Sequence, residues 1–349
     1  MFSKFRSLIF KIDPETTHDL AIKSLKFNFV QNIFDKNKNE PMFQTSLFGK
    51  QIKNPIGMAA GFDKNAEIYN SLFKLGFGFV EVGTVTPLKQ FGNPKPRLFR
   101  LIEDQALINR LGFNNFGADN INSRIRSNIP KGLLGINIGP NYDTKDRIMD
   151  YLSGLRTFHD IADYLTINIS SPNTENLRNF HDKDKFDKLM SSIEEEKKNL
   201  KSKIPIAVKI SPDISNEQTN EISQILLNHE VEAIIVSNTT EENRENLQGE
   251  LKYQKGGLSG KPLEIKSNQL ISKFYDLLKG KIKIIGVGGV DSGKSAYNKF
   301  LAGANYIQLY TGIVYQGPNI VAKIKKELKE LLINKGVKNF EKIIGQKNN

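Results

Sequence analysis

The chain has 349 residues, of which 38% are apolar and none is cysteine, and its formal net charge is +12. The lack of cysteine excludes disulfides, cysteine-held iron–sulfur clusters and a cysteine nucleophile or base, and the four scattered histidines lack the spacing of a zinc site. No zinc finger, RNA-recognition aromatic set or long basic tract accompanies the positive charge, so we expect neither a metal nor a nucleic-acid partner.

Residues 1–40 are predicted to form a helical extension, separate from the main domain. Apolar residues at helical spacing predict a first helix, namely Phe2, Phe5, Leu8 and Ile9. Asp13-Pro14 supplies an N-cap and a first-turn proline for a second helix, whose apolar face carries Ala21, Ile22, Leu25 and Phe29. The pair has more aromatic surface than two short helices can bury between themselves, so it either docks on the main domain or faces a lipid surface or hydrophobic ligand.

No apolar run reaches about 18 residues, the length needed to span a membrane. The N-terminus also lacks the uninterrupted apolar stretch and small-residue cleavage site of a secretory signal. We therefore expect no membrane-spanning segment and no secretory leader.

Eight short apolar or alternating runs follow from residue 55 onward, with helix-compatible segments between them. They span 55–60, 77–86, 133–139, 164–170, 204–210, 233–238, 282–290 and 306–311. Eight parallel strands joined by helices close into a (β/α)8 barrel, which we predict for residues 41–349; the alternative is an open doubly wound sheet. Polar residues follow nearly every run, as expected when all strands open on one mouth, and Gly286-Val-Gly-Gly289 lacks the dinucleotide-binding spacing.

The first three runs bring candidate ligand contacts to that mouth. Gly61 and Lys64 follow the first run, and this lysine is predicted to contact a ligand anion, against the alternative of an ordinary surface lysine. Gly83-Thr84 ends the second run and offers close backbone approach together with a hydroxyl group. Asn137 lies inside the third, otherwise apolar run, so it needs a ligand or a hydrogen-bonded neighbour.

The next three runs predict a site for a planar polar ring. Thr166 to Thr174 places Asn168, Ser171 and Asn173 at the end of a strand, although Ser-Pro-Asn is also good turn chemistry. Lys209 interrupts a buried run, so its ammonium must face a carboxylate or an anionic ligand such as an electron-accepting ring. Ser237 to Thr240 adds amides and hydroxyls without a carboxylate, which suits a heterocycle better than a sugar.

Glycine clusters predict a phosphate site beside the last two strands. They are Gly256 to Gly260, Gly286 to Gly289 and Tyr310 to Gly312. Each could be an ordinary tight turn, but together they offer free backbone N–H groups where barrels commonly hold phosphate. FMN fits this prediction better than an NAD-type ligand.

These segments resemble the dihydroorotate dehydrogenases of the membrane-associated, quinone-using class (class 2). The similarity extends from Asp13-Pro-Glu-Thr-Thr-His18 to the final helices and includes the motifs at 58–64, 83–87, 96–100, 108–115, 168–174 and 286–289. It implies oxidation of (S)-dihydroorotate to orotate in pyrimidine (UMP) biosynthesis, with electrons passing through FMN to ubiquinone or menaquinone. In that reaction a base removes the C5 proton while a hydride leaves C6. The base is a cysteine in the soluble class and a serine in the membrane class, and Ser171 stands at its position.

The same resemblance implies roles for the remaining site residues. The expected substrate contacts are Lys64, Asn109, Arg110, Leu111, Gly112, Phe113, Asn168, Asn173, Asn238 and Thr239. The expected FMN contacts are Ala60, Gly61, Lys64, Thr84, Asn137, Asn168, Lys209, Ser237, Gly260, Gly289, Tyr310 and Thr311. The quinone tunnel is expected to include His18, Arg100 and Tyr310.

We further expect a monomer attached peripherally to the cytoplasmic side of a bacterial inner membrane through the helical extension and the basic surface. Two alternatives stay open at this point: a related FMN-barrel reductase acting on another pyrimidine, and a basic barrel that binds nucleic acid.

Overall fold

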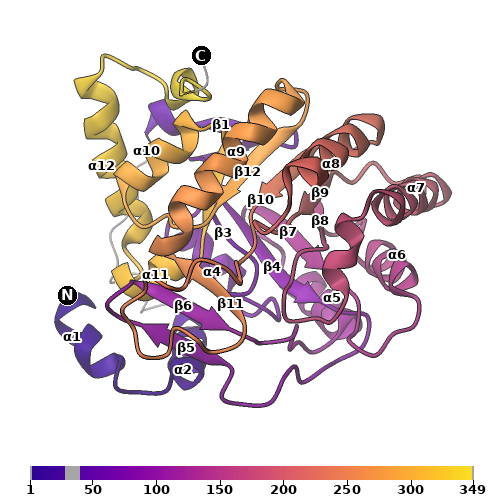
Figure 1. Cartoon of the computed structure of the whole chain (residues 1–349), viewed down its shortest axis with the longest axis horizontal. Coiled ribbons are helices and arrows are strands. Elements are labelled where there is room, and N and C mark those ends of the chain that lie inside the picture. Colours follow the sequence, from indigo (N-terminus) through magenta and orange to yellow (C-terminus); the bar gives the residue numbers. More distant parts are fainter. Residues whose placement is uncertain (1, 28–39, 348–349) are drawn as a thin grey trace.

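The computed structural model describes residues 2–27 and 40–347, with residues 2–5 described by their backbone alone. Its centre is a closed barrel of parallel strands in the order β10-β12-β13-β3-β4-β7-β8-β9 (Figure 1). The strands are β3 (Ile56–Met58), β4 (Phe79–Val85), β7 (Leu133–Ile138), β8 (Tyr164–Asn168), β9 (Ile206–Lys209), β10 (Ala233–Val236), β12 (Lys283–Val287) and β13 (Tyr306–Leu309). Each predicted run contains one of them, so the barrel prediction is confirmed and the open-sheet alternative is wrong.

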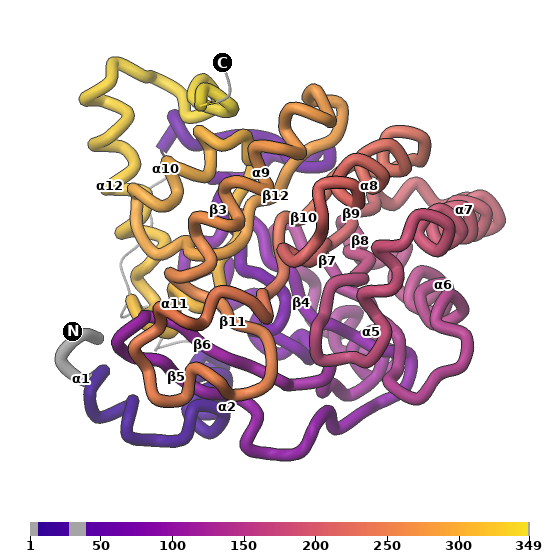
Figure 2. Tube along the Cα trace, in the orientation of Figure 1, coloured from indigo at the N-terminus to yellow at the C-terminus, as the bar shows by residue number. Residues whose placement is uncertain are grey.

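Helices surround the barrel, as the tube view in Figure 2 shows. They are α4 (Tyr69–Lys74), α5 (Ala118–Ser127), α6 (Arg147–Phe158), α7 (Lys183–Asn199), α8 (Asn216–Asn228), α9 (Glu264–Leu278), α10 (Gly293–Leu301), α11 (Thr311–Gln316) and α12 (Ile320–Asn334), with short 3₁₀ turns η1 (Pro41–Phe43), η2 (Leu177–His181), η3 (Lys261–Leu263) and η4 (Phe340–Ile343). Local sequence sets where two of them begin. Capping boxes at Ser215 with Gln218 and at Ser292 with Ser295 satisfy the free N–H groups of α8 and α10.

Aromatic rings fill the barrel interior where glycines leave room for them. A Cβ on Gly135 would lie 2.1 Å from the Tyr164 ring, and one on Gly57 would lie 2.4 Å from the Phe79 ring. Both rings are fully buried. These buried rings pack part of the barrel interior.

Two small antiparallel sheets were not predicted. One is the hairpin of β1 (Thr45–Leu47) and β2 (Lys50–Ile52). The other has the order β11-β6-β5 and consists of β5 (Leu98–Leu101), β6 (Ala106–Asn109) and β11 (Gly257–Gly260). The glycine-rich segment 256–260 therefore belongs largely to a strand and is not a simple tight turn.

Of the N-terminal helices, α1 (Phe2–Ile9) packs beside α11 and α2 (Pro14–Leu25) packs beside β5 (Figure 1). Asp13 caps α2 as predicted, by accepting a hydrogen bond from the Thr16 N–H. The buried Glu15 carboxylate accepts hydrogen bonds from Arg97 at 2.7 and 3.1 Å, which fixes α2 to the chain next to β5. Phe29, placed on the second helix by the sequence, lies with the rest of 28–39 outside the described residues.

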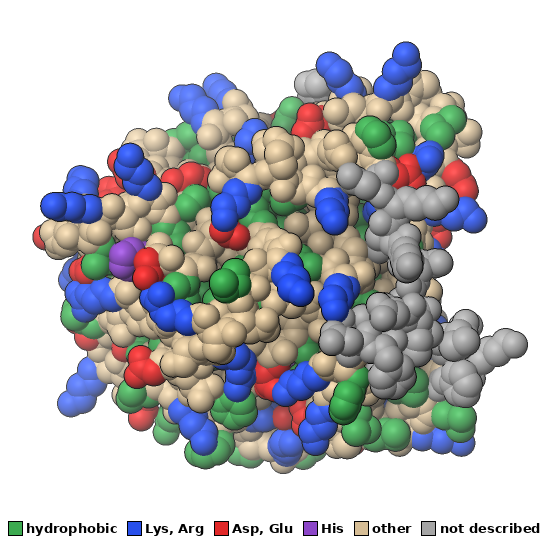
Figure 3. Space-filling model, turned by 180° about the vertical axis from the view of Figure 1, so that it is seen from behind, with side chains coloured by type: hydrophobic (Ala, Val, Ile, Leu, Met, Phe, Trp, Pro, Cys, Tyr) green, Lys and Arg blue, Asp and Glu red, His purple; other side chains and the backbone are tan. Residues whose placement is uncertain are grey.

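Part of the apolar surface of this extension faces outward. Leu8, Leu20 and Phe27 have exposed fractions of 60%, 48% and 61%. None of the helices in the described ranges is long and apolar enough to cross a membrane. On the face in Figure 3, Lys and Arg side chains are scattered over the surface and do not gather into one tract.

Candidate active site

A cavity opens at the C-terminal ends of the barrel strands, under the β11-β6-β5 sheet. Its empty space, including the part open to solvent, is about 1230 Å³. Every barrel strand except β7 contributes to its lining, either directly or, for β3 and β10, through the segment that follows it, as predicted for a mouth shared by the strands. The predicted site residues that line it are Ala60, Gly61, Lys64, Thr84, Asn109, Leu111, Gly112, Phe113, Asn168, Ser171, Asn173, Lys209, Ser237, Asn238, Thr239, Gly260, Gly289, Tyr310 and Thr311.

The loop after β8 places Ser171 in the cavity wall, with an exposed fraction of 6%. Its hydroxyl oxygen accepts a hydrogen bond from the Asn173 N–H at 3.2 Å. Among the described residues, no group accepts the Ser171 hydroxyl proton. This hydroxyl is therefore held on one side by the loop and can still donate to, or exchange a proton with, a bound molecule.

Amide side chains from three segments line the cavity together with Ser171. Asn173 Nδ2 donates to Asn109 Oδ1 at 3.2 Å, which joins the loop after β8 to the end of β6. Asn238 Nδ2 donates to the Ser170 hydroxyl at 2.9 Å. The Thr239 hydroxyl is buried and has no partner in the described structure, so a ligand in this cavity would relieve the cost of its burial. Such a wall suits a planar ring with carbonyl and N–H groups.

Two lysines bring positive charge to the cavity without a hydrogen-bond partner among the described residues. Burial lowers the pKa of Lys64 to about 8, although Glu15 and Asp19 oppose the shift. Burial also lowers the pKa of Lys209, against the field of Glu81. A buried ammonium without a hydrogen-bonded partner is costly, so both positions fit an anionic or electron-rich ligand.

Beneath the cavity lies a buried polar layer centred on Glu81. Its carboxylate accepts hydrogen bonds from Asn137 at 2.8 Å, Tyr164 at 3.0 Å, Thr166 at 3.1 Å and Gln308 at 3.0 Å. Because Asn137 Nδ2 points to this carboxylate, the Asn137 oxygen points to the cavity side. It accepts there from the Thr84 hydroxyl and from Asn168 Nδ2.

The hydrogen bonds that the Asn137 oxygen accepts from the Thr84 hydroxyl and from Asn168 Nδ2 measure 2.6 and 3.2 Å. Asn137 was predicted as a direct FMN contact, but it does not line the cavity, because Thr84 and Asn168 cover it. The side chains of Glu81, Thr84 and Asn168 satisfy the hydrogen-bonding groups of the Asn137 amide. Of the two alternatives predicted for Asn137, a ligand or a hydrogen-bonded neighbour, the structure shows the second.

Glycines on the opposite wall form a cradle of backbone groups. Gly289 has φ +76° and a Cβ there would lie 2.4 Å from the Glu264 Cβ; Gly260 has φ +97° and a Cβ there would lie 2.4 Å from the Gln105 carbonyl oxygen. Thr311, at the start of α11, shares a 2.8 Å hydrogen bond with Ser259. A side chain at either position would collide with these neighbours, so glycine allows the close packing that brings this backbone to the cavity wall, where backbone N–H groups suit a phosphate-sized anion.

Of the three predicted tunnel residues, His18 lies on α2, Arg100 on β5 and Tyr310 directly after β13, and only Tyr310 lines the cavity. The His18 ring stacks on the Tyr310 ring at 6.5 Å and meets the Phe62 ring edge-on at 5.2 Å. Burial, reinforced by the charge of Lys64, lowers the pKa of His18 to about 3, so this imidazole is neutral at pH 7. Arg100 donates to the carbonyls of Phe10 and Ile12 at 3.2 and 2.8 Å, which holds the end of α1 and the turn before α2.

Arg110 is the expected substrate residue whose side chain the structure turns elsewhere. Its guanidinium donates to the carbonyls of Pro96 and Lys255 and to the Gln254 side chain, and it lies over the Phe99 ring. It does not line the cavity and instead links β6 to the segment before β11.

Other lining residues were not named as site residues from the sequence, namely Leu98, Gln105, Leu107, Asn114, Lys261, Leu263, Val290, Leu309 and Tyr315. Many of them belong to the small β11-β6-β5 sheet and its connections. Among the described residues, no group of three or more His, Asp or Glu is arranged to hold a metal ion.

Comparison with known proteins gives consistent matches over most of the chain. The sequence profile of the family described as dihydroorotate dehydrogenase matches residues 42–332. The chain is 45% identical to the dihydroorotate dehydrogenase (quinone) of Bartonella tribocorum over 342 residues, which covers 96% of this chain and 94% of that protein. It is 43% identical to the mitochondrial dihydroorotate dehydrogenase (quinone) of Mus musculus, covering 96% and 87%. A crystal structure of DHODH from Eimeria tenella in complex with ferulenol matches with a TM-score of 0.92 at 36% identity and covers 96% of both chains.

Proposed function

The chain belongs to the dihydroorotate dehydrogenase family, and we propose that its barrel cavity performs the quinone-dependent reaction with Ser171 as the base. The enzyme oxidises dihydroorotate to orotate in pyrimidine biosynthesis, with FMN as cofactor and quinone as electron acceptor. The residue assignment rests on one observation, namely that these side chains line the same cavity. One cavity brings together the Ser171 hydroxyl, a set of amide side chains and two lysines, and among the described residues neither the hydroxyl proton nor the lysines have a hydrogen-bond partner.

The residues present fit FMN. Lys209 offers a buried cation to an electron-accepting ring, and the cradle at Gly260, Gly289 and Thr311 offers backbone N–H groups to a single phosphate. Thr84 and Asn168 are held from below through Asn137, so their side chains are fixed before any ligand arrives. When bound, FMN supplies the hydride acceptor for the reaction.

Dihydroorotate loses a proton and a hydride from neighbouring ring carbons. We assign proton removal to the Ser171 hydroxyl, and ring orientation to Asn109, Asn173, Asn238 and Thr239. Lys64 supplies positive charge for the substrate carboxylate or the adjacent ring. Leu111, Gly112 and Phe113 shape the wall above the ring. A positioned general base typically contributes about 10²–10⁴-fold in rate.

We assign quinone access to the side of the cavity covered by α1 and α2. Tyr310 lines the cavity and stacks against the neutral His18, and Arg100 holds the turn between the two helices. The exposed Leu8, Leu20 and Phe27 give this extension an apolar outer surface, which suits peripheral attachment to the cytoplasmic side of an inner membrane. We further propose that the enzyme acts as a monomer, with residues 1–40 as the quinone-access extension and 41–349 as the catalytic barrel.

Anaerobic flavin spectroscopy tests this function. Purified protein is mixed with dihydroorotate without oxygen, and the bleaching of the flavin absorbance is followed; a soluble quinone, fumarate or NAD is then added. We expect bleaching by dihydroorotate and recovery of the absorbance with the quinone alone. A flavin that dihydroorotate leaves oxidised, but that NADPH reduces, would contradict the proposal in favour of a reductase acting on another pyrimidine. A colourless protein whose nucleic-acid binding falls steeply with salt would contradict the enzyme assignment altogether.

A further inference from the structure

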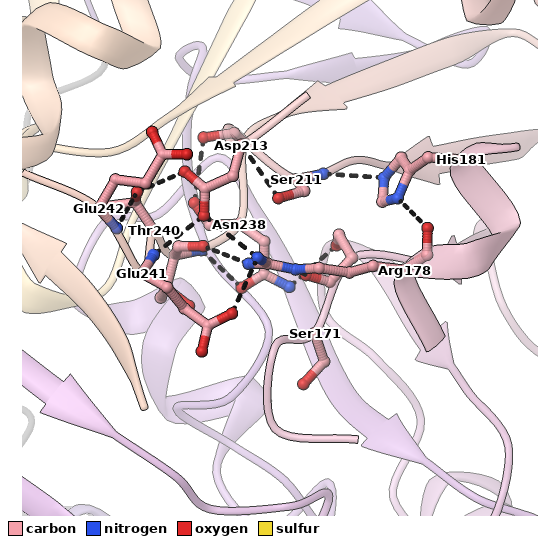
Figure 4. A network of polar contacts seen from close by, with 12 residues as sticks. Ser171, Arg178, His181, Ser211, Asp213, Asn238, Thr240, Glu241 and Glu242 are labelled. Carbon is pink, nitrogen blue, oxygen red and sulfur yellow. Dashed lines mark hydrogen bonds and ion pairs between the residues drawn. The ribbon is translucent and has the colours of Figure 1, made fainter. Parts of the chain in front are cut away.

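One guanidinium group ties together the three loops that follow β8, β9 and β10. Arg178 lies in η2, in the same loop as Ser171. Its Nε donates to the Ser170 carbonyl at 3.2 Å, and one terminal nitrogen donates to Asp213 at 3.1 Å and to Glu241 at 3.2 Å. The other terminal nitrogen donates to the Thr239 carbonyl at 3.0 Å. Figure 4 shows the guanidinium inside this network, while the Ser171 side chain points away from it.

The main chain of Arg178 is fixed separately, by His181. The Ser211 N–H donates to His181 Nε2 at 3.2 Å, so Nε2 carries no proton, and Nδ1 then donates its proton to the Arg178 carbonyl at 2.8 Å. Burial lowers the pKa of His181 to about 4, which keeps the imidazole in this neutral form at pH 7. Arg178 is thus anchored at its backbone to the loop after β9, and its side chain reaches back toward the start of its own loop.

The contact with Ser170 acts directly on the peptide that carries Ser171. A peptide group is planar, so a donor that fixes the Ser170 carbonyl also fixes the Ser171 N–H and the position of the Ser171 Cα, from which the side chain leaves the backbone. No other group among the described residues donates to this carbonyl. The Ser171 side chain itself accepts a hydrogen bond from the Asn173 N–H, but Asn173 belongs to the same loop and moves with it.

The other partners hold the guanidinium in place. Asp213 is nearly buried, with 7% of its side chain exposed, whereas Glu241 is 46% exposed and contributes little. Although burial opposes it, hydrogen bonds from Lys266 and Thr240 hold the pKa of Asp213 below its usual value. Lys266 therefore still balances Asp213 when Arg178 is replaced by a neutral residue, so the loss of Arg178 leaves no unpaired buried carboxylate.

We propose that Arg178 is a positioning residue for the reaction, which sets the Ser171 hydroxyl toward the substrate by holding the Ser170–Ser171 peptide against the loops after β9 and β10. This inference rests on the proposed role of Ser171 as the base. Without the guanidinium, the peptide can rotate and shift the hydroxyl by about 1 Å, a misplacement that costs on the order of 10²-fold in rate.

A double-mutant cycle tests this proposal with the holoenzyme. The rate of anaerobic flavin bleaching and its dependence on dihydroorotate concentration are measured for wild type, Arg178→Gln, Ser171→Ala and the double variant, together with FMN content and Tm. We expect Arg178→Gln to lower the limiting rate by about 10–10²-fold with FMN retained and the half-saturating concentration nearly unchanged. In the Ser171→Ala background the same change should cost less than about 3-fold, because the group it positions is gone.

Two further variants complete the design. Arg178→Lys keeps the charge and should recover part of the rate; it also replaces Arg178→Gln in the cycle if that variant does not fold. Arg156→Gln is the matched control. Arg156 donates two hydrogen bonds of 2.8 Å to the Glu196 carboxylate, and neither residue lines the cavity, so the bleaching rate of this variant should equal that of wild type.

Equal losses from Arg178→Gln with and without Ser171, or an unchanged rate in Arg178→Gln, would overturn the proposal while leaving Ser171 as the base. A wild-type rate in Ser171→Ala would overturn both assignments.

Discussion

Replacing Glu81 by glutamine tests the buried polar layer that supports the active site. Glu81 is fully buried, and four donors converge on its carboxylate. Glutamine offers one oxygen and an NH₂ group, so at least one of these donors then faces another donor. In addition, Lys209 loses the negative charge that opposes the lowering of its pKa.

The hydrogen-bond geometry gives the magnitude. One buried donor left unpaired costs about 1–3 kcal/mol, and three bonds that lose their charge assistance cost about 1 kcal/mol each, for a total of about 4–6 kcal/mol. At about 2.1 cal/mol/K of unfolding entropy per residue, a chain of this length has an unfolding entropy of about 0.7 kcal/mol/K. The predicted fall in Tm is therefore about 5–8 °C.

Calorimetric unfolding of the FMN-free protein measures this effect without interference from ligand binding. Glu230→Gln is the matched control: the Glu230 side chain is 70% exposed and lies 3.9 Å from Lys197, so its Tm should change by less than about 1 °C. If Glu81→Gln melts within about 1 °C of wild type, the four hydrogen bonds to Glu81 contribute no net stability, and the predicted supporting role of this layer is wrong.

Three other predictions concern the cofactor and pH. Lys209→Met should weaken FMN binding by about 10–10²-fold. The FMN-free variant should keep its Tm, because the ammonium has no hydrogen-bond partner to lose among the described residues. Equilibrium flavin titration measures the affinity, and an unchanged affinity would contradict this prediction. Gly289→Ala should lower FMN content after purification, since its Cβ would lie 2.4 Å from the Glu264 Cβ, whereas Gly280→Ala, with φ +75° and no atom within 4 Å, should keep its flavin. Burial lowers the pKa of His181 to about 4 from an ordinary value near 6.5, so its neutral form contributes stability that is complete above about pH 6.5 and is lost as the pH falls toward 4. Urea unfolding at pH 7.5, 5.5 and 4.5 should therefore show less acid sensitivity in His181→Gln than in wild type, and parallel pH curves would contradict this.

The barrel could be predicted from the sequence because its strands are buried on both faces. Parallel strands of this kind are nearly continuous apolar runs, such as Leu133 to Ile138, and eight of them at regular spacing leave few topologies. The β11-β6-β5 sheet escaped prediction for the opposite reason. Its strands have four residues each, β11 is half glycine, and its pairing joins Asn109 to Gly257 across a long stretch of chain.

Some residues of the candidate site could likewise be predicted from the sequence, and others could not. Ser171 and Lys209 stand out in the sequence because polar groups at the ends of apolar runs point to a barrel mouth, and the structure places both in the cavity wall. Glu81 gave the same kind of signal, a charged residue inside an apolar run, but its four partners lie on three other strands, so its role depends on tertiary contacts. Arg178 gave no local signal, because it follows Ser171 by seven residues, in a short 3₁₀ turn, and its acceptors belong to three separate loops.

The rate of flavin bleaching in Ser171→Ala shows whether Ser171 is the base in an FMN-dependent oxidation of dihydroorotate. We expect this variant to keep its FMN and its Tm but to bleach about 10²–10⁴-fold more slowly than wild type at saturating dihydroorotate. A bleaching rate close to wild type, or loss of FMN together with activity, would contradict this role of Ser171.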